Sequence, residues 1–140
     1  MQGKLTDPRL LLALSAVLLL GMLVVWYLFI HDPTPTIMPD EAREKAATFL
    51  ELIRTGRVDE AWAATSTDFK SMFGRERFRQ FVRNQPVLRM AVEFESCEFP
   101  RQAQLRVVEC TFRPVGGKGT IKVVLNVDQG TWKVGRLNVE

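Results

Sequence analysis

Hydrophobic residues form an unbroken run near the start of the chain. Leu10–Ile30 reads LLLALSAVLLLGMLVVWYLFI, 21 residues with no charge and no polar face. At about 1.5 Å per residue, a helix of this length spans the roughly 30 Å hydrocarbon core of a bilayer. The run therefore predicts a single transmembrane helix at residues 10–30.

The end of this run distinguishes a retained anchor from a cleaved signal peptide. Signal peptides have apolar regions of about 7–15 residues that end in small residues. Here the run ends in bulky residues that include Trp26 and Tyr27, and no A-x-A pattern follows. Both rings suit a membrane–water interface. Two cations precede the run and the first one after it is Arg43, so we expect a signal-anchor with residues 1–9 cytoplasmic.

A proline-rich segment follows at residues 31–39. Its three prolines fix φ and remove amide donors, which predicts an extended stalk of about 3.1 Å per residue. His31, the only histidine, lies at its start without an orienting partner, and we interpret it as incidental. The remaining residues 40–140 are long enough for one extracytoplasmic domain, periplasmic if the membrane is a bacterial inner membrane.

Helical periodicity begins at Pro39 or Asp40 and ends at Gly56. A short second helix is predicted in VDEAWAAT, and a third at Arg75–Asn84. The apolar stripe of the first helix consists of Ala42, Ala46, Phe49, Leu50 and Ile53, and that of the third of Phe78, Phe81 and Val82.

From Val87 onward apolar residues alternate with polar ones, which is typical of strands. Four strands are expected, separated by turn signals that include GGKG and DQG. They lie around Met90–Phe94, Leu105–Val115, Ile121–Val127 and Trp132–Val139. Short connections imply antiparallel pairing, so the fold class is α+β, with three helices packed on a four-stranded antiparallel sheet.

Several of these segments resemble the nuclear transport factor 2-like (cystatin-like) superfamily. Its bacterial members share a Gly-x-x-(x)-Ala-Trp second helix, a Ser-x-x-x-Phe third helix and a closing Gly-x-Trp-Lys-Val strand. The matching residues are Gly56, Ala61, Trp62, Phe78, Gly130, Trp132, Lys133 and Val134. The resemblance covers residues 40–140 and implies a cone-shaped domain, which some members use for catalysis and others only for binding.

The net charge and the residue types present limit which partners and reactions the sequence supports. The net charge of +3 is too small to indicate nucleic acid. The expected domain has no His and no Tyr, so acid–base catalysis would depend on carboxylates such as Asp68 or Glu93.

GGKGT at Gly116–Thr120 lacks phosphate-loop spacing and is interpreted as a hairpin turn. No metal or cofactor is expected, because the glutamates that could bind one fit a solvated sheet face instead. They are Glu93, Glu95, Glu98 and Glu109.

Two further groups of residues are candidate sites. Lys70, Arg77 and Arg89 accompany Arg75, Arg79 and Arg83, which repeat at i+4 and form a candidate patch for an anionic partner. An ordinary solvated face is the alternative. Cys97 and Cys110 would face each other if the first two strands turn between Ala103 and Gln104, so a disulfide is geometrically available. Two alternatives remain open: Cys97 lies on the outer face of the sheet, or a bulge interrupts the pairing of the two strands.

The sequence therefore predicts a noncatalytic, single-pass protein that binds the bilayer and other membrane protein subunits, as an accessory or assembly subunit. The alternatives are a small-ligand binder or enzyme that uses the cone cavity, and a protein that binds envelope or anionic lipid through the arginine-rich helix.

Overall fold

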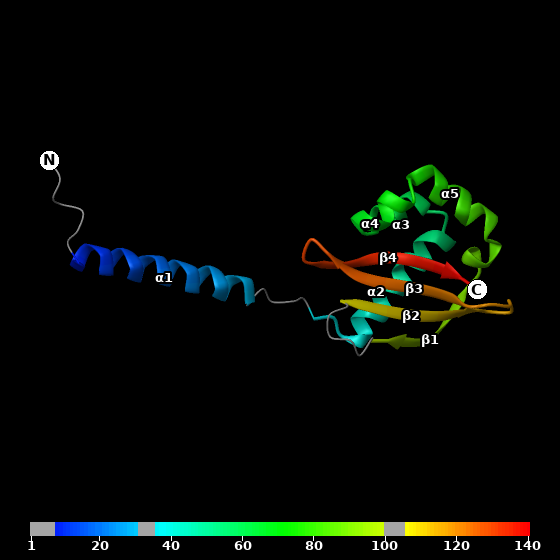
Figure 1. The fold of residues 1–140 in the computed structure, drawn as a ribbon. Helices are drawn as coiled ribbons and strands as arrows, with labels where there is room; N and C mark the ends of the chain where they lie inside the picture. The colour runs from blue at the N-terminus through cyan, green and yellow to red at the C-terminus, as the bar shows by residue number, and fades with distance from the viewer. Residues whose placement is uncertain (1–7, 31–35, 100–105) are drawn as a thin grey trace. The chain divides into compact units, whose positions relative to one another are not determined.

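The computed structural model describes residues 8–30, 36–99 and 106–140, and within the first helix the side chains of 12–28. The chain divides into two compact units, Met1–Thr34 and Pro35–Glu140 (Figure 1). The predicted tail at 1–7, His31 and the predicted turn at Ala103–Gln104 lie outside the described residues.

The first unit contains helix α1, Pro8–Ile30, which begins two residues before the predicted Leu10. Its large apolar side chains between Leu12 and Leu28 are 50–75% exposed. Among the residues with described side chains, no helix is long and apolar enough to cross a membrane.

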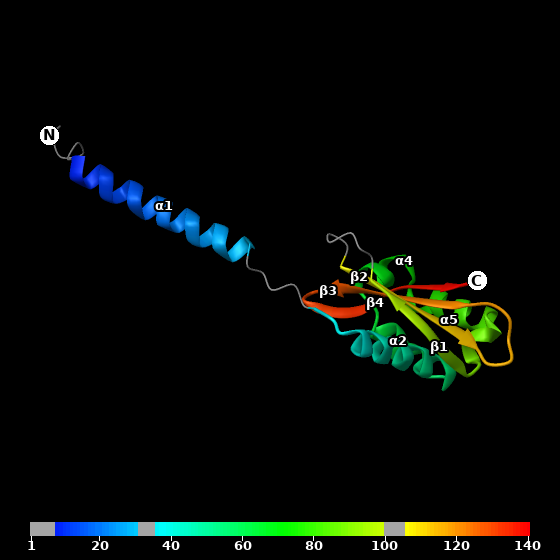
Figure 2. The same ribbon diagram turned by 90° about the horizontal axis from the view of Figure 1, so that it is seen from below.

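The second unit is α+β, as predicted. Its helices are α2 (Pro39–Arg54), α3 (Val58–Ala63), α4 (Thr67–Met72), α5 (Arg75–Asn84) and the 3₁₀ helix η1 (Pro86–Arg89). Its strands are β1 (Val92–Glu98), β2 (Val107–Pro114), β3 (Ile121–Asp128) and β4 (Thr131–Val139), paired antiparallel in chain order (Figure 2).

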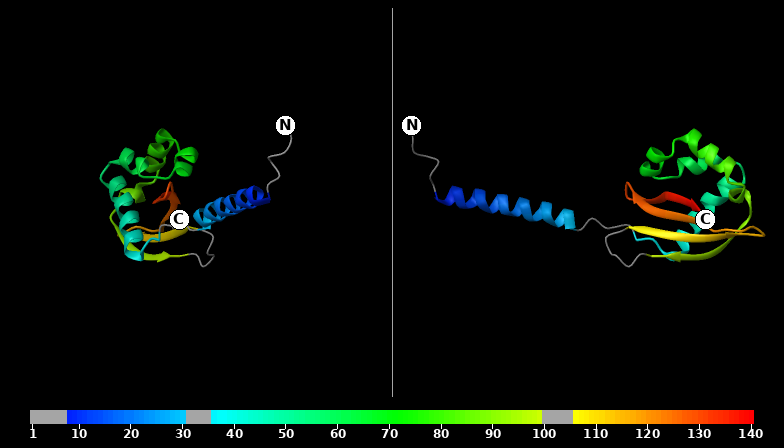
Figure 3. Two further views of the ribbon diagram at one scale, coloured as in Figure 1. Left: turned by 90° about the vertical axis from the view of Figure 1, so that its left-hand side faces the viewer. Right: turned by 45° about the vertical axis from the view of Figure 1, so that its right-hand side comes forward.

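Helix α2 organises the packing of this unit. Pro39 occupies its first turn with Asp40 and Glu41, whose charges favour a helix N-terminus. The chain leaves the helix through Gly56, which has φ +81°. The predicted stripe is confirmed, because all five of its residues are buried. Helix α2 runs across the sheet and contacts all four strands (Figure 3).

Ile37 changes the expected boundary between stalk and domain. It is only 5% exposed and belongs to the hydrophobic core, whereas its neighbour Met38 is 66% exposed. Ile37 lies within the proline-rich segment and was therefore predicted to belong to the stalk and not to the core. The folded unit therefore includes Ile37, and the predicted stalk at 31–39 is too long at its C-terminal end.

The predicted three helices omit α4. Ser66 caps it by accepting a hydrogen bond from the Phe69 amide, and Phe69 enters the core. Ser66 N also donates to Val134 O, which attaches the start of α4 to the edge of β4. With six residues, α4 is too short to show an amphipathic period.

The first strand begins later than predicted. Pro86–Arg89 forms η1, which buries Leu88, so Met90 precedes β1 instead of lying within it. Between Phe94 and Ser96 the β1–β2 register shifts at Glu95. Such a bulge reverses the side-chain alternation along the strand, which a simple period of two does not reveal.

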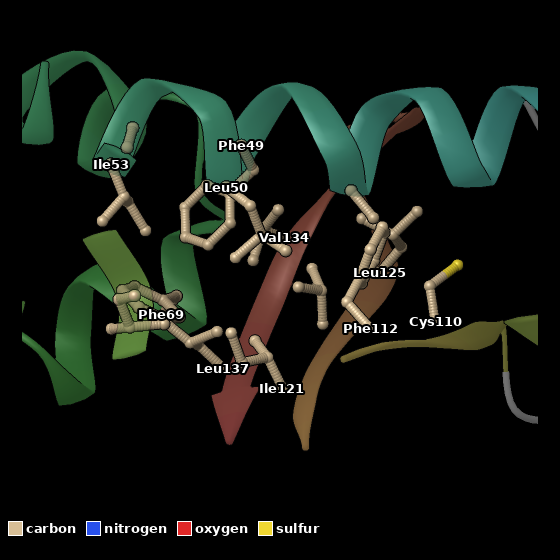
Figure 4. Close-up of a cluster of buried hydrophobic side chains, with 14 of the residues drawn as sticks. Phe49, Leu50, Ile53, Phe69, Cys110, Phe112, Ile121, Leu125, Val134 and Leu137 are labelled. Carbon is tan, nitrogen blue, oxygen red and sulfur yellow. The ribbon is translucent and has the colours of Figure 1, made fainter. Parts of the chain in front are cut away.

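The core lies between α2 and the sheet. Figure 4 shows side chains of α2 directed at residues of the strands, with Phe69 completing the cluster from α4. Complete burial of an aliphatic or phenyl side chain contributes about 1.5–3 kcal/mol. The labelled residues are Phe49, Leu50, Ile53, Phe69, Cys110, Phe112, Ile121, Leu125, Val134 and Leu137.

Candidate functional site

A cleft of about 330 Å³ lies between α2 and the β3–β4 hairpin. Its apolar wall includes Phe49, Leu125 and Trp132. Glu41 and Lys45 lie at its rim, with 4.0 Å between Lys45 Nζ and Glu41 Oε1. The other lining residues are Glu44, Thr48, Leu52, Ala64, Lys133 and Val134. An apolar wall with a charged rim can bind a small amphipathic ligand.

The carboxylates considered for catalysis do not meet in this cleft. Asp68 lies in the first turn of α4 and Glu93 in β1, and both are exposed. Neither lines the cleft. Glu41 and Glu44, which do line it, are exposed as well. The structure therefore does not bring Asp68 and Glu93 together as an acid–base pair.

The predicted arginine row is divided by a salt bridge. Arg79 donates from Nε to Asp59 Oδ1 at 2.7 Å, and it also pairs with Glu76. The hydrogen bond from Arg79 is the main reason that the pKa of Asp59 is lowered, and Coulombic attraction to Arg79 and Arg75 adds to it. Arg79 thus joins α5 to α3 instead of presenting a free charge.

Arg75 and Arg83, the other members of the row, make contacts with neutral groups. The Arg75 guanidinium carbon lies 5.2 Å from the centre of the Trp62 ring, which Lys70 also approaches. Arg83 donates to Gln80 Oε1 at 2.8 Å. Both retain their positive charge at the surface, since cation–π and amide contacts do not neutralise it.

The four glutamates of the first two strands occupy the solvated face that was predicted for them. Glu95 pairs with Arg113 at 2.8 Å across the strands. Glu109 and Glu98 also raise the pKa of Lys122 by Coulombic attraction, although its hydrogen bond with Glu140 has the largest effect. Among the described residues, no group of three or more His, Cys, Asp or Glu side chains could hold a metal ion.

Cys97 and Cys110 form a disulfide between β1 and β2. They are direct partners in the register, with 4.0 Å between their Cα atoms. The bulge at Glu95 places Cys97 on the inner face, against the core, and Cys110 is completely buried. The sequence left open whether a bulge interrupts the first strand, and the structure has one at Glu95.

GGKGT connects two antiparallel strands, β2 and β3, as predicted for a hairpin turn. Gly116 and Gly119 have φ of +71° and +101°, which favours glycine at both positions. A strand-to-strand turn does not offer the helix N-terminus that a phosphate loop requires.

One polar connection was missed from the sequence. Asp128 Oδ2 accepts hydrogen bonds from the Thr67 amide at 2.9 Å and the Thr67 hydroxyl at 3.0 Å, and it also pairs with Lys133. The bond from the Thr67 amide is the largest cause of the lowered pKa of Asp128. Asp128 was assigned only to a turn, because nothing local links it to a residue 61 positions away.

The predicted interface residues Trp26 and Tyr27 lie near the C-terminal end of α1, and their side chains are 66% and 60% exposed.

Comparison of the whole chain with protein families, characterised proteins and solved structures found no match. Three surfaces therefore remain as candidates for function: apolar α1, the cleft beside α2, and the arginines of α5.

Proposed function

We propose that the protein is a noncatalytic, single-pass membrane protein that presents its α+β unit outside the cytoplasm and binds other subunits of a membrane complex. The observation that carries the proposal is the exposure of α1. Its large side chains from Leu12 to Leu28 are apolar or aromatic and at least half exposed. Leaving one such side chain in water instead of burying it costs about 1.5–3 kcal/mol, so α1 requires apolar surroundings.

The sequence around α1 supports the orientation. Lys4 and Arg9 flank its start, whereas Asp32 is the first charged residue after Ile30. Positive charge is retained preferentially on the cytoplasmic side. A disulfide between Cys97 and Cys110 agrees with a domain in an oxidising compartment.

The α+β unit supports a binding role. Its apolar side chains fill the space between α2 and the sheet, and the remaining cleft has only exposed carboxylates, Glu41 and Glu44. We propose that the unit has the nuclear transport factor 2-like fold, since its helices precede a four-stranded meander in the order that the resemblance implies.

The test is extraction of the full chain from native membranes in a neutral detergent, followed by native mass measurement. The proposal expects the chain in a particle with at least one other membrane protein subunit at a fixed ratio. A strictly monomeric chain, or one found in the soluble fraction without detergent, would argue against it.

A second candidate function is small-ligand binding in the cleft. The 330 Å³ volume and the Phe49 and Trp132 rings favour it. Thr48 lines the cleft and is exposed, so Thr48→Trp should fill the space without disturbing the core. A bound small molecule in the native mass of wild type that disappears in T48W would support this function over subunit binding.

A further inference from the structure

The positive charge of the second unit is unevenly compensated. Among the described residues, most cations of α2 and the sheet lie within 4.0 Å of carboxylates, as in the pair of Arg54 with Glu51, and Arg43 and Arg136 are the exceptions. Arg57, just before α3, pairs with Glu60. On α5 and η1, only Arg79 has such a pair among the described residues. The four arginines that lack one are here called the basic surface: Arg75, Arg77, Arg83 and Arg89.

Neutral contacts hold three of these arginines at the protein surface. Arg89 donates to Arg83 O at 3.1 Å, close to the C-terminal end of α5, and Arg83 donates to Gln80. Arg75 lies against Trp62, whose indole is fixed by a 2.8 Å hydrogen bond to Phe73 O. The side chains are thus partly ordered before a ligand arrives, which lowers the entropic cost of binding.

Helix α5 is itself firmly attached. Phe78 and Val82 are buried, and the Phe78 ring lies 6.3 Å from that of Phe49 on α2. Arg79 adds the salt bridge to Asp59 on α3. The charges of the basic surface therefore have a rigid support.

We propose that the basic surface is a docking site for an acidic segment of a partner protein, in which clustered Asp or Glu carboxylates bind Arg75, Arg77, Arg83 and Arg89. Guanidinium groups suit carboxylates because they donate two parallel hydrogen bonds. This inference rests on the proposed subunit-binding role and names the chemistry of the partner.

The test uses the full chain in neutral detergent and a fluorescent twelve-residue polyglutamate peptide, with binding followed by anisotropy. Wild type should bind at low salt and weaken steeply as salt is added. The exposed pair Arg77→Glu and Arg83→Glu, changed together, should weaken binding by at least about tenfold. Arg136→Glu, an exposed arginine on β4, is the matched control and should change binding by less than about twofold.

A second double variant, with Gln at positions 77 and 83, keeps the test decisive if the Glu pair fails to fold. Absence of wild-type binding, or equal weakening by R136E, would overturn the inference. So would a variant effect seen only with nanodiscs of anionic lipid, which would instead indicate a lipid site. Because native mass measurement of the complex tests subunit binding separately, failure with the peptide would remove only the acidic partner.

Discussion

The Cys97–Cys110 disulfide allows a quantitative prediction. The cysteines are 13 residues apart, and cross-linking a loop of this length stabilises a protein by about 3 kcal/mol through the entropy of the unfolded chain. For a unit of about 100 residues, one kcal/mol corresponds to roughly 4–8 °C in Tm. Reduction should therefore lower the Tm of the Pro35–Glu140 unit by roughly 12–24 °C.

The assay is thermal unfolding of the full chain in neutral detergent, followed by near-ultraviolet circular dichroism with and without a phosphine reductant. A variant with Ala at positions 97 and 110 serves as the control, since the reductant should not change its Tm. Amide hydrogen exchange should show the loss first in β1, an edge strand held by β2 on one side only. Equal Tm values for the oxidised and reduced chain would refute the reasoning.

Three other changes test individual contacts. Ile37→Ala should lower the free energy of unfolding by about 2–5 kcal/mol in urea titrations, whereas exposed Met38→Ala should leave it nearly unchanged, and equal effects would contradict the assignment of Ile37 to the core. Asp128→Asn should lower the free energy of unfolding at neutral pH. The pKa of the native carboxyl is below its ordinary 3.8, so the carboxylate stabilises the fold above pH 3.8, and this stabilisation is lost as the pH falls through the native pKa. A difference in unfolding free energy between variant and wild type that does not change with pH would count against this explanation. Gly119→Ala should lower the Tm, because φ at this position is +101° and the new Cβ would lie 2.3 Å from the backbone oxygen of Glu140. Gly74→Ala is its control, because a Cβ there meets nothing within 4 Å. Equal Tm values for the two variants would exclude a steric cause.

Regular periodicity predicted the parts of the fold that depend on it. The stripe of α2 repeats over about three turns, and the alternation from Ile121 to Val127 continues across β3, so both elements could be identified locally. Helix α4 has only six residues and depends on the cap from Ser66 and the contact with Val134, which is distant in sequence. It could not be identified from local periodicity.

The candidate sites were predictable to the extent that they depend on spacing. The i+4 repeat correctly placed Arg75, Arg79 and Arg83 on one helix, but it could not show that Asp59, 20 residues before Arg79, pairs with it. Likewise, the turn expected between Ala103 and Gln104 placed Cys97 opposite Cys110 without revealing the bulge that turns Cys97 inward. Long-range polar contacts and bulges have no local sequence period, so they require the tertiary structure.

The most direct test of the central claim is the intact mass of the protein retained in native membranes after an alkaline carbonate wash. The account predicts that the chain in the washed membrane pellet still contains residues 10–30. A protein released into the wash, or a shortened chain that begins after Ile30, would contradict it.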